Sequence, residues 1–181
     1  MVAQKELKPV EQIDLGSFRL GEQDTLIGFS TRSGMIELAQ ALIKQSEREL
    51  IYYADHLDDS LLGQKLVSDG LEGLIRRNRL ARIKILVKSS NQLVHTGNRI
   101  VEMLRSHMPE AECRIRPQRS QNYGGTFILL DGIGYMYQPS IDRFAGTGCF
   151  YSVSTIEALN NLFNAEWGVS GPDPEMQPLT I

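Results

Sequence analysis

Short apolar runs alternate with helical segments along the middle of the chain, and this alternation constrains the fold more than any other feature. TLIGFS from Thr25, ELIYYAD from Glu49 and RIKILVK from Arg82 each have the length and composition of a strand. Between them apolar residues recur at helical spacing, as in the segment 36–43. The pattern predicts an α/β fold with a mixed, mostly parallel sheet sandwiched by helices.

The second half of the chain adds further elements of both kinds. The segment 90–108 has helix-compatible spacing, and ECRIRP at 112–117 is a short strand candidate. GGTFILLDGIGYMYQPS, at 124–140, is typical of a β-hairpin whose turn is formed by Asp131 and Gly132. This hairpin contributes antiparallel strands, which is why the sheet is expected to be mixed.

The length of 181 residues fits one domain with a sizeable core. Residues 1–24 show no clear periodicity and are interpreted as a linker or a strap. Residues 25–168 form the predicted domain, whose last helix is opened by a capping box at Ser154 and Glu157. Residues 169–181 are a tail rich in Pro and Gly, which cannot continue that helix.

The composition excludes several classes of protein. Hydrophobic residues make up 41% of the chain and charged residues 23%, and the sequence contains neither a long apolar run nor a leader at its N-terminus. On these grounds we expect a cytoplasmic protein without a membrane partner. Cys113 and Cys149 are too few for a disulfide framework and lack the spacing of a zinc site. We therefore expect neither a bound metal nor a cofactor.

The net charge of -3 gives no overall attraction to a phosphate backbone. Nucleic acid would need a local basic patch, for which the segment 76–88 is the candidate. That segment has no aromatic residues among its basic ones, so its simplest interpretation is a helix end and a strand edge that face water. We do not expect a nucleic-acid partner.

Four residues are candidates for ligand binding, and each has an alternative structural role. Asp131 either belongs to a site or is only the residue that opens a tight turn. Asp142 and Arg143, after the hairpin, and Arg99, in the third helical segment, could hold a phosphate or a carboxylate. Ion pairs and loop hydrogen bonds are the alternative for these three. The acidic stretch DHLDDS from Asp55 is interpreted as ordinary helix capping rather than a metal site.

At the hairpin the order of elements resembles one repeat of the phospholipase D-like fold, over roughly Thr25 to Trp167. Active members of that superfamily carry the motif HxKxxxxD, followed by a GSxN segment. With Asp131 as the motif aspartate, Gly124 stands at the histidine position and Thr126 at the lysine position. Further along, the glycine, serine and asparagine positions are occupied by Gln138, Pro139 and Ile141. The resemblance therefore implies a scaffold without its nucleophile and without its charge-stabilising amine.

The chain also resembles an uncharacterised bacterial branch of this fold, which occurs alone or after a GNAT-type acetyltransferase domain. The matching segments are FRLGEQD at Phe18, ARIKILVKSSNQLVHTGNRI at Ala81, QPSIDRFAGTGCF at Gln138, and the tail from Trp167 through PDPEMQPL. Relatives tend to have a histidine where this chain has Asn98. The length leaves no room for an acetyltransferase domain, so we expect a standalone form or a fragment.

These observations favour a non-catalytic phospholipase D-like domain that serves binding or assembly. A homodimer is expected, because active single-repeat relatives build their site at a two-fold interface. One alternative is a sensor or enzyme with a reshaped pocket for a phosphorylated or carboxylated small molecule, using Arg99, Asp131, Asp142 and Arg143. Another alternative is an accessory module that works with an acetyltransferase partner.

Overall fold

A computed structural model describes residues 6–57, 59–90, 98–118, 124–140 and 142–176. The helices are α1 (Arg32–Ile43), α2 (Lys65–Arg77), α4 (Arg99–Ser106) and α5 (Val153–Trp167), with short 3-10 helices η1 (Val10–Gln12), η2 (Leu15–Ser17) and η3 (Pro174–Met176). The strands are β1 (Leu7–Pro9), β2 (Leu26–Phe29), β3 (Glu49–Tyr53), β4 (Arg82–Val87), β5 (Ala111–Ile115), β6 (Thr126–Leu130), β7 (Gly134–Gln138), β8 (Gly146–Cys149) and β9 (Gly171–Pro172).

All the described strands form one sheet in the order β1-β2-β8-β7-β6-β3-β4-β5-β9. The sheet is mixed, as predicted, but parallel pairing does not predominate. Three pairings are parallel and five are antiparallel. Parallel pairing unites β3, β4 and β5, which are linked through α2 and α4, and it joins β1 to β2. The sequence prediction missed β8 and β9, and both add antiparallel neighbours.

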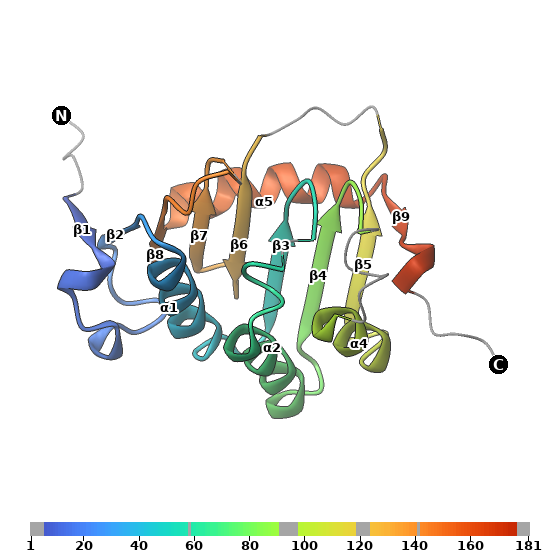
Figure 1. Cartoon of the computed structure of the whole chain (residues 1–181), viewed down its shortest axis with the longest axis horizontal. Helices are drawn as coiled ribbons and strands as arrows, with labels where there is room; N and C mark the ends of the chain where they lie inside the picture. The colour runs from blue at the N-terminus through green and yellow to red at the C-terminus, as the bar shows by residue number, and fades with distance from the viewer. Residues whose placement is uncertain (1–5, 58, 91–97, 119–123, 141, 177–181) are drawn as a thin grey trace.

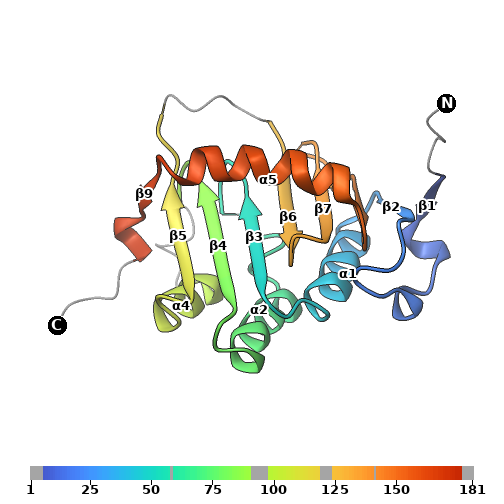
Figure 2. The ribbon, with the colours of Figure 1, turned by 180° about the vertical axis from the view of Figure 1, so that it is seen from behind.

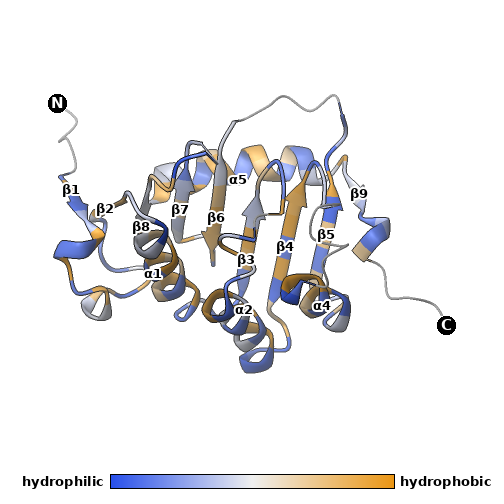
Figure 3. Cartoon of the chain, viewed as in Figure 1, coloured by the Kyte–Doolittle hydropathy of each residue, from blue (hydrophilic) through white to orange (hydrophobic). Residues whose placement is uncertain are grey.

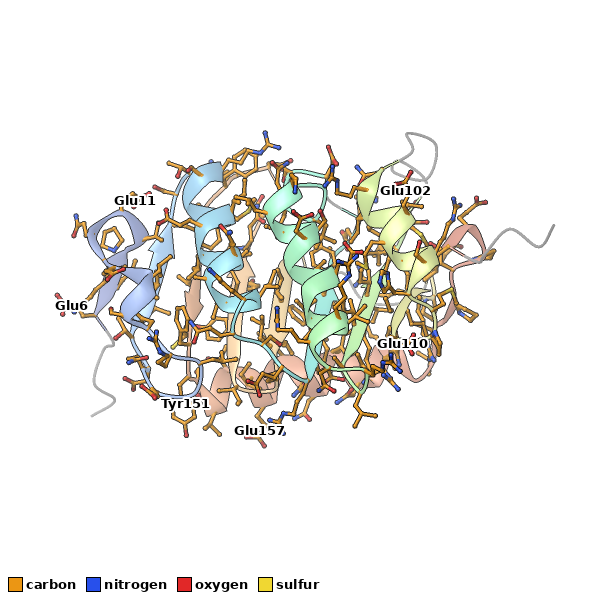
Figure 4. The ribbon with its side chains drawn as sticks, turned by 90° about the horizontal axis from the view of Figure 1, so that it is seen from below. Glu6, Glu11, Glu102, Glu110, Tyr151 and Glu157 are labelled. Atoms are coloured by element: carbon orange, nitrogen blue, oxygen red, sulfur yellow. The ribbon has the colours of Figure 1, made fainter. Side chains whose placement is uncertain are left out.

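Helices cover both faces of the sheet, which confirms the predicted α/β sandwich. Figure 1 shows α1, α2 and α4 in front of the sheet, and Figure 2 shows α5 crossing the opposite face. Seen from below, Glu102 of α4 and Glu157 of α5 lie at the outer rims on opposite sides (Figure 4). The hydrophobic residues lie between these layers, and Figure 3 shows them along most of β4.

Successive side chains of the central strands point to opposite faces of the sheet, and this produces two hydrophobic cores. Leu50 and Tyr52 of β3 point to the core under α1, α2 and α4, whereas Ile51 and Tyr53 point to the core under α5. Both cores exclude solvent, and Tyr52 and Tyr53 are 0% and 1% exposed. The period of two residues along each strand therefore decides which side chains each helix layer covers.

Elements at the two ends differ from the sequence prediction. The N-terminal segment contributes β1, η1 and η2, and the tail contributes β9 and η3. Helix α5 begins at Val153 after Ser152, which makes no side-chain cap hydrogen bond, so the predicted capping box at Ser154 does not open the helix. Strand β8 has the sequence GTGC, which has no alternation of apolar and polar residues from which a strand could be predicted. A Cβ atom on Gly146 would lie 2.2 Å from the carbonyl oxygen of Tyr137, so the close approach of β8 to β7 requires glycine there.

Candidate functional site

Gly124 and Thr126, which stand at the histidine and lysine positions of the HxKxxxxD motif, lie at the amino end of β6. Gly124 precedes the strand with a φ of 77°, and a Cβ atom there would have no neighbour within 4 Å. Thr126 begins the strand and is only 6% exposed. This edge of the sheet therefore receives no imidazole and no amine from the two positions where the family's chemistry needs them.

Strand β7 ends at the same edge of the sheet, and its last residue has an amide side chain. Gln138 ends β7 and is 2% exposed. Its Nε2 donates to the carbonyl oxygens of Ser140, at 3.1 Å, and Arg143, at 2.9 Å. Gln138 thus fixes the backbone of the loop between β7 and β8. Ile141, which stands at the family's asparagine position, lies outside the described residues.

Asp131 lies at the other end of β6 and acts as an acceptor for a neighbouring loop. Its Oδ1 accepts from the Ser46 hydroxyl at 2.8 Å and from the backbone N–H groups of Arg48 and Glu49, both at 2.9 Å. Its Oδ2 accepts from the backbone N–H of Glu47 at 2.8 Å. Of the two interpretations offered by the sequence, this geometry favours the structural one. The residue has a φ of 55°, as its turn requires.

These hydrogen bonds also set the electrostatics of Asp131. Partial burial by itself raises the pKa of its carboxyl group. The hydrogen bonds from Glu49, Glu47, Arg48 and Ser46 favour the charged form and outweigh burial, so the pKa lies below its ordinary value.

The structure does not bring the four predicted ligand-binding residues together. Arg99 begins α4, and its Nη1 lies 3.5 Å from Oδ1 of Asp69 on α2. Asp142 and Arg143 are exposed in the loop that follows β7, separated from α4 and β5 by β6, β3 and β4 in the sheet order. Asp131 follows the opposite end of β6. A pocket made from all four is incompatible with this arrangement.

Arg116, just after β5, is a buried charged residue that the sequence analysis did not single out. Its side chain is 0% exposed and lies over the ring of Tyr53, with Cζ 4.4 Å from the ring centroid. The guanidinium donates to the hydroxyl of Tyr53, to a carboxylate oxygen of Asp55 and to the carbonyl oxygen of Ala54. Glu166 of α5 lies 3.4 Å away and accepts from Tyr53 at 3.1 Å.

The Arg116 network is better suited to stability than to chemistry. Burial is the main cause that raises the pKa of Tyr53 well above its ordinary value, so its phenol stays protonated and is a poor nucleophile. Two carboxylates surround Arg116, so the network leaves no excess positive charge for an anionic substrate. No sequence spacing would reveal this network, because its partners lie 50 to 63 residues away.

The described residues hold no group of three or more His, Cys, Asp or Glu side chains that could bind a metal ion, and Asp58 lies outside them. Both cysteines are free and buried. Within the part of the chain that the structure describes, no helix combines the length and the apolar character that crossing a membrane requires.

Solved structures with related architecture come from the phospholipase D group and from a chromatin protein. NucT from Helicobacter pylori is similar with a TM-score of 0.59 and 8% identity, over 82% of this chain and 99% of that one. Nuc from Salmonella typhimurium, a phospholipase D family member, is similar with a TM-score of 0.53 and 9% identity, over 76% and 89%. The chain therefore has a phospholipase D-like fold.

TrmBL2, an archaeal chromatin protein whose structure shows a novel mode of DNA binding, is similar with a TM-score of 0.59 and 12% identity. The match covers 82% of this chain and 54% of TrmBL2, so the chain spans about half of that protein. At these identities the likeness concerns the fold alone.

No curated protein matches the chain. A model of one protein family, the domain of unknown function DUF7931, matches residues 31–179, and the chain therefore belongs to that family.

Proposed function

We propose that this protein is a non-catalytic phospholipase D-like domain of the cytoplasm that works through binding or assembly. The observation that carries the proposal is the amino end of β6, where Gly124 provides no side chain and Thr126 is buried. Covalent attack on phosphorus needs a nucleophile, and the transition state needs a cation beside the phosphoryl oxygens. Loss of either group typically costs several kcal/mol of transition-state stabilisation, and each ~1.4 kcal/mol lowers the rate about tenfold.

A histidine from another element is the clearest challenge to this proposal. Of the described histidines, His56 follows β3 on the sheet edge where Gly124 precedes β6, and His107 ends α4. Purified protein should therefore be incubated with a chromogenic phosphodiester beside its His56→Ala variant. We expect both proteins to match the buffer blank. Cleavage by the unaltered protein that disappears in His56→Ala would refute the non-catalytic proposal.

Assembly is the second part of the proposal, with a homodimer as the expected state. It is supported by the resemblance to single-repeat relatives whose sites lie at a two-fold interface. Light scattering over a wide range of protein concentrations should give a dimer mass. A monomer at every concentration contradicts the assembly part and leaves the catalytic part untouched.

Nucleic acid remains outside the proposal, because the chain has a net charge of -3 and three of the six basic residues in the segment 76–88 are paired with carboxylates. Arg76 lies 2.6 Å from a carboxylate oxygen of Glu72, Lys84 lies 2.6 Å from Glu49, and Lys88 lies 3.5 Å from Asp55. An electrophoretic mobility assay with duplex DNA at about 0.15 M salt should therefore show no shift.

Two further proposals follow from the sequence. A small-molecule sensor or an enzyme with a reshaped pocket would need a different set of residues from the four predicted ones, since these lie apart. An accessory role beside an acetyltransferase, as in the bacterial branch that the chain resembles, predicts that an acetyltransferase is recovered with the tagged protein from its native cell. A pull-down that recovers none counts against it.

A further inference from the structure

Two adjoining cavities lie beside the end of α1, where the N-terminal segment folds back over that helix. The first has a volume of about 500 Å³ and the second about 670 Å³, and Arg19 and Gln45 line both. Lys44 also lines the first, and Arg48 the second. These volumes are in the range of small-molecule sites. We call the two cavities together the strap cleft.

The walls of the strap cleft are held to one another by hydrogen bonds. The side chain of Gln45 accepts from the backbone N–H of Leu20 at 2.9 Å and donates to the carbonyl oxygen of Phe18 at 3.0 Å. Across the second cavity, the N–H of Arg48 donates to Asp131 at 2.9 Å. The cleft is therefore formed before any ligand arrives, which lowers the entropy cost of binding.

Arg19 presents an oriented guanidinium to both cavities. Its Nη1 donates to the carbonyl oxygens of Gly16, at 2.7 Å, and Phe18, at 3.0 Å. Among the described residues, its Nε and Nη2 have no acceptor. These two atoms form the fork of parallel N–H donors that matches a carboxylate or a phosphate bidentately.

The other charged side chains of the cleft limit how much negative charge a ligand can carry. Neither Lys44 nor Arg48 forms an ion pair within the described residues, so both can add positive charge beside Arg19. The carboxylate of Asp131 is already occupied by its four donors. Glu22, Glu37 and Glu47 also line the cleft. With Asp131 they make four carboxylates against three cations, so the cleft has no excess of positive charge, which disfavours a polyanion such as a nucleic-acid backbone. A single oxyanion group would be held by the local donors of Arg19 rather than by the net charge of the cleft.

We propose that the strap cleft is a binding site for a small molecule that carries one carboxylate or one phosphate group, held bidentately by Arg19 with Lys44 and Arg48 nearby. FRLGEQD, one of the segments on which the family resemblance rests, supplies Arg19, Leu20 and Glu22 to this site. The cleft lies at the Asp131 end of β6, away from Gly124 and Thr126. Its occupancy is therefore independent of whether the chain has phosphodiesterase chemistry at Gly124 and Thr126.

The test is a titration of ¹⁵N-labelled protein with inorganic phosphate and, separately, with acetate, at an ionic strength held constant with NaCl. We expect saturable shifts of backbone amide signals in residues 16–22 and 44–48. Saturation by phosphate alone assigns a phosphate group, and saturation by acetate alone assigns a carboxylate. Absence of saturable shifts with both anions overturns the proposal.

Variants separate the site from general anion binding. Arg19→Gln should weaken the affinity at least about tenfold, because charge-assisted hydrogen bonds are lost. Lys44→Gln, whose side chain makes no hydrogen bond within the described residues, should weaken it severalfold and serves as a second test if Arg19→Gln disturbs the strap. Arg79→Gln, an exposed arginine outside the cleft, is the matched control and should bind as the unaltered protein does. Equal affinity in Arg19→Gln, Lys44→Gln and the control would overturn the assignment.

Discussion

Oδ1 of Asp131 lies 2.8 Å from the hydroxyl oxygen of Ser46, although 85 residues separate the two in sequence. The same carboxylate accepts from three successive backbone N–H groups, those of Glu47, Arg48 and Glu49. One side chain therefore holds together the loop that enters β3 and the turn that leaves β6. Asp131, which stands at the aspartate position of the family's motif, therefore has a structural role: it links the turn after β6 to the loop before β3.

Replacing Asp131 by alanine should destabilise the protein by about 2 kcal/mol, because four hydrogen bonds to a charged acceptor are lost at a half-buried site. Urea unfolding followed by circular dichroism measures the change. Asp142→Ala is the matched control, since Asp142 is exposed and its side chain accepts no hydrogen bond within the described residues. It should change the free energy of unfolding by less than about 0.5 kcal/mol. Equal effects of the two variants would contradict the structural role of Asp131.

The stabilisation by Asp131 should depend on pH in the direction set by its lowered pKa. Because the folded-state pKa lies below the unfolded value of about 3.9, the contribution is fully present above that value. It is lost as the pH falls through the folded-state pKa. The difference in unfolding free energy between the unaltered protein and Asp131→Asn should therefore be constant from about pH 5 to 7 and shrink in more acidic solution. Urea unfolding at neutral and at acidic pH measures this difference. A difference that grows toward acidic pH would contradict the prediction.

Replacing Arg116 by methionine should destabilise the protein by about 3 kcal/mol, because Glu166, whose side chain is 13% exposed, loses its cationic partner and Asp55 keeps only Lys88, at 3.5 Å. Arg76→Met is the control, since the Arg76 side chain is 72% exposed and pairs with Glu72 at the surface. Its effect should stay below about 0.5 kcal/mol. Urea unfolding at neutral pH compares the two, and a similar small loss in both would show that the buried network contributes nothing.

Cys113 should resist alkylation in the folded protein. Burial, followed by the nearby charges of Asp173 and Glu112, raises the pKa of its thiol well above the ordinary value. The reactive thiolate is therefore scarce, and the side chain is only 5% exposed. Mass spectrometry after iodoacetamide treatment at about pH 8 should find Cys113 modified in urea and unmodified without it. Rapid modification of the folded protein would mean that this part of the sheet opens readily.

The central strands could be predicted from sequence because their apolar patterns are strong and local. TLIGFS, ELIYYAD and RIKILVK become β2, β3 and β4, and the Asp131-Gly132 turn joins β6 to β7 as expected. Strand β8 could not be predicted, because its GTGC sequence pairs through glycines that fit against β7 rather than through an apolar pattern. The predominance of parallel pairing was wrong for the same reason, since β8 and β9 are recognisable only once their neighbours are in place.

The sequence by itself determined the alternation of strands and helices, the hairpin, and the residues that stand at the motif positions, because each of these depends on residue types at short spacing. Only the tertiary structure decided what Asp131, Arg116 and Arg19 do. The partners of Asp131 and Arg116 lie 50 or more residues away in the chain. The cleft beside Arg19 likewise exists only where the N-terminal segment meets α1 and the turn at Asp131. Hydrogen bonds and cavities depend on distances in space, and the sheet order that sets those distances is a property of the whole chain.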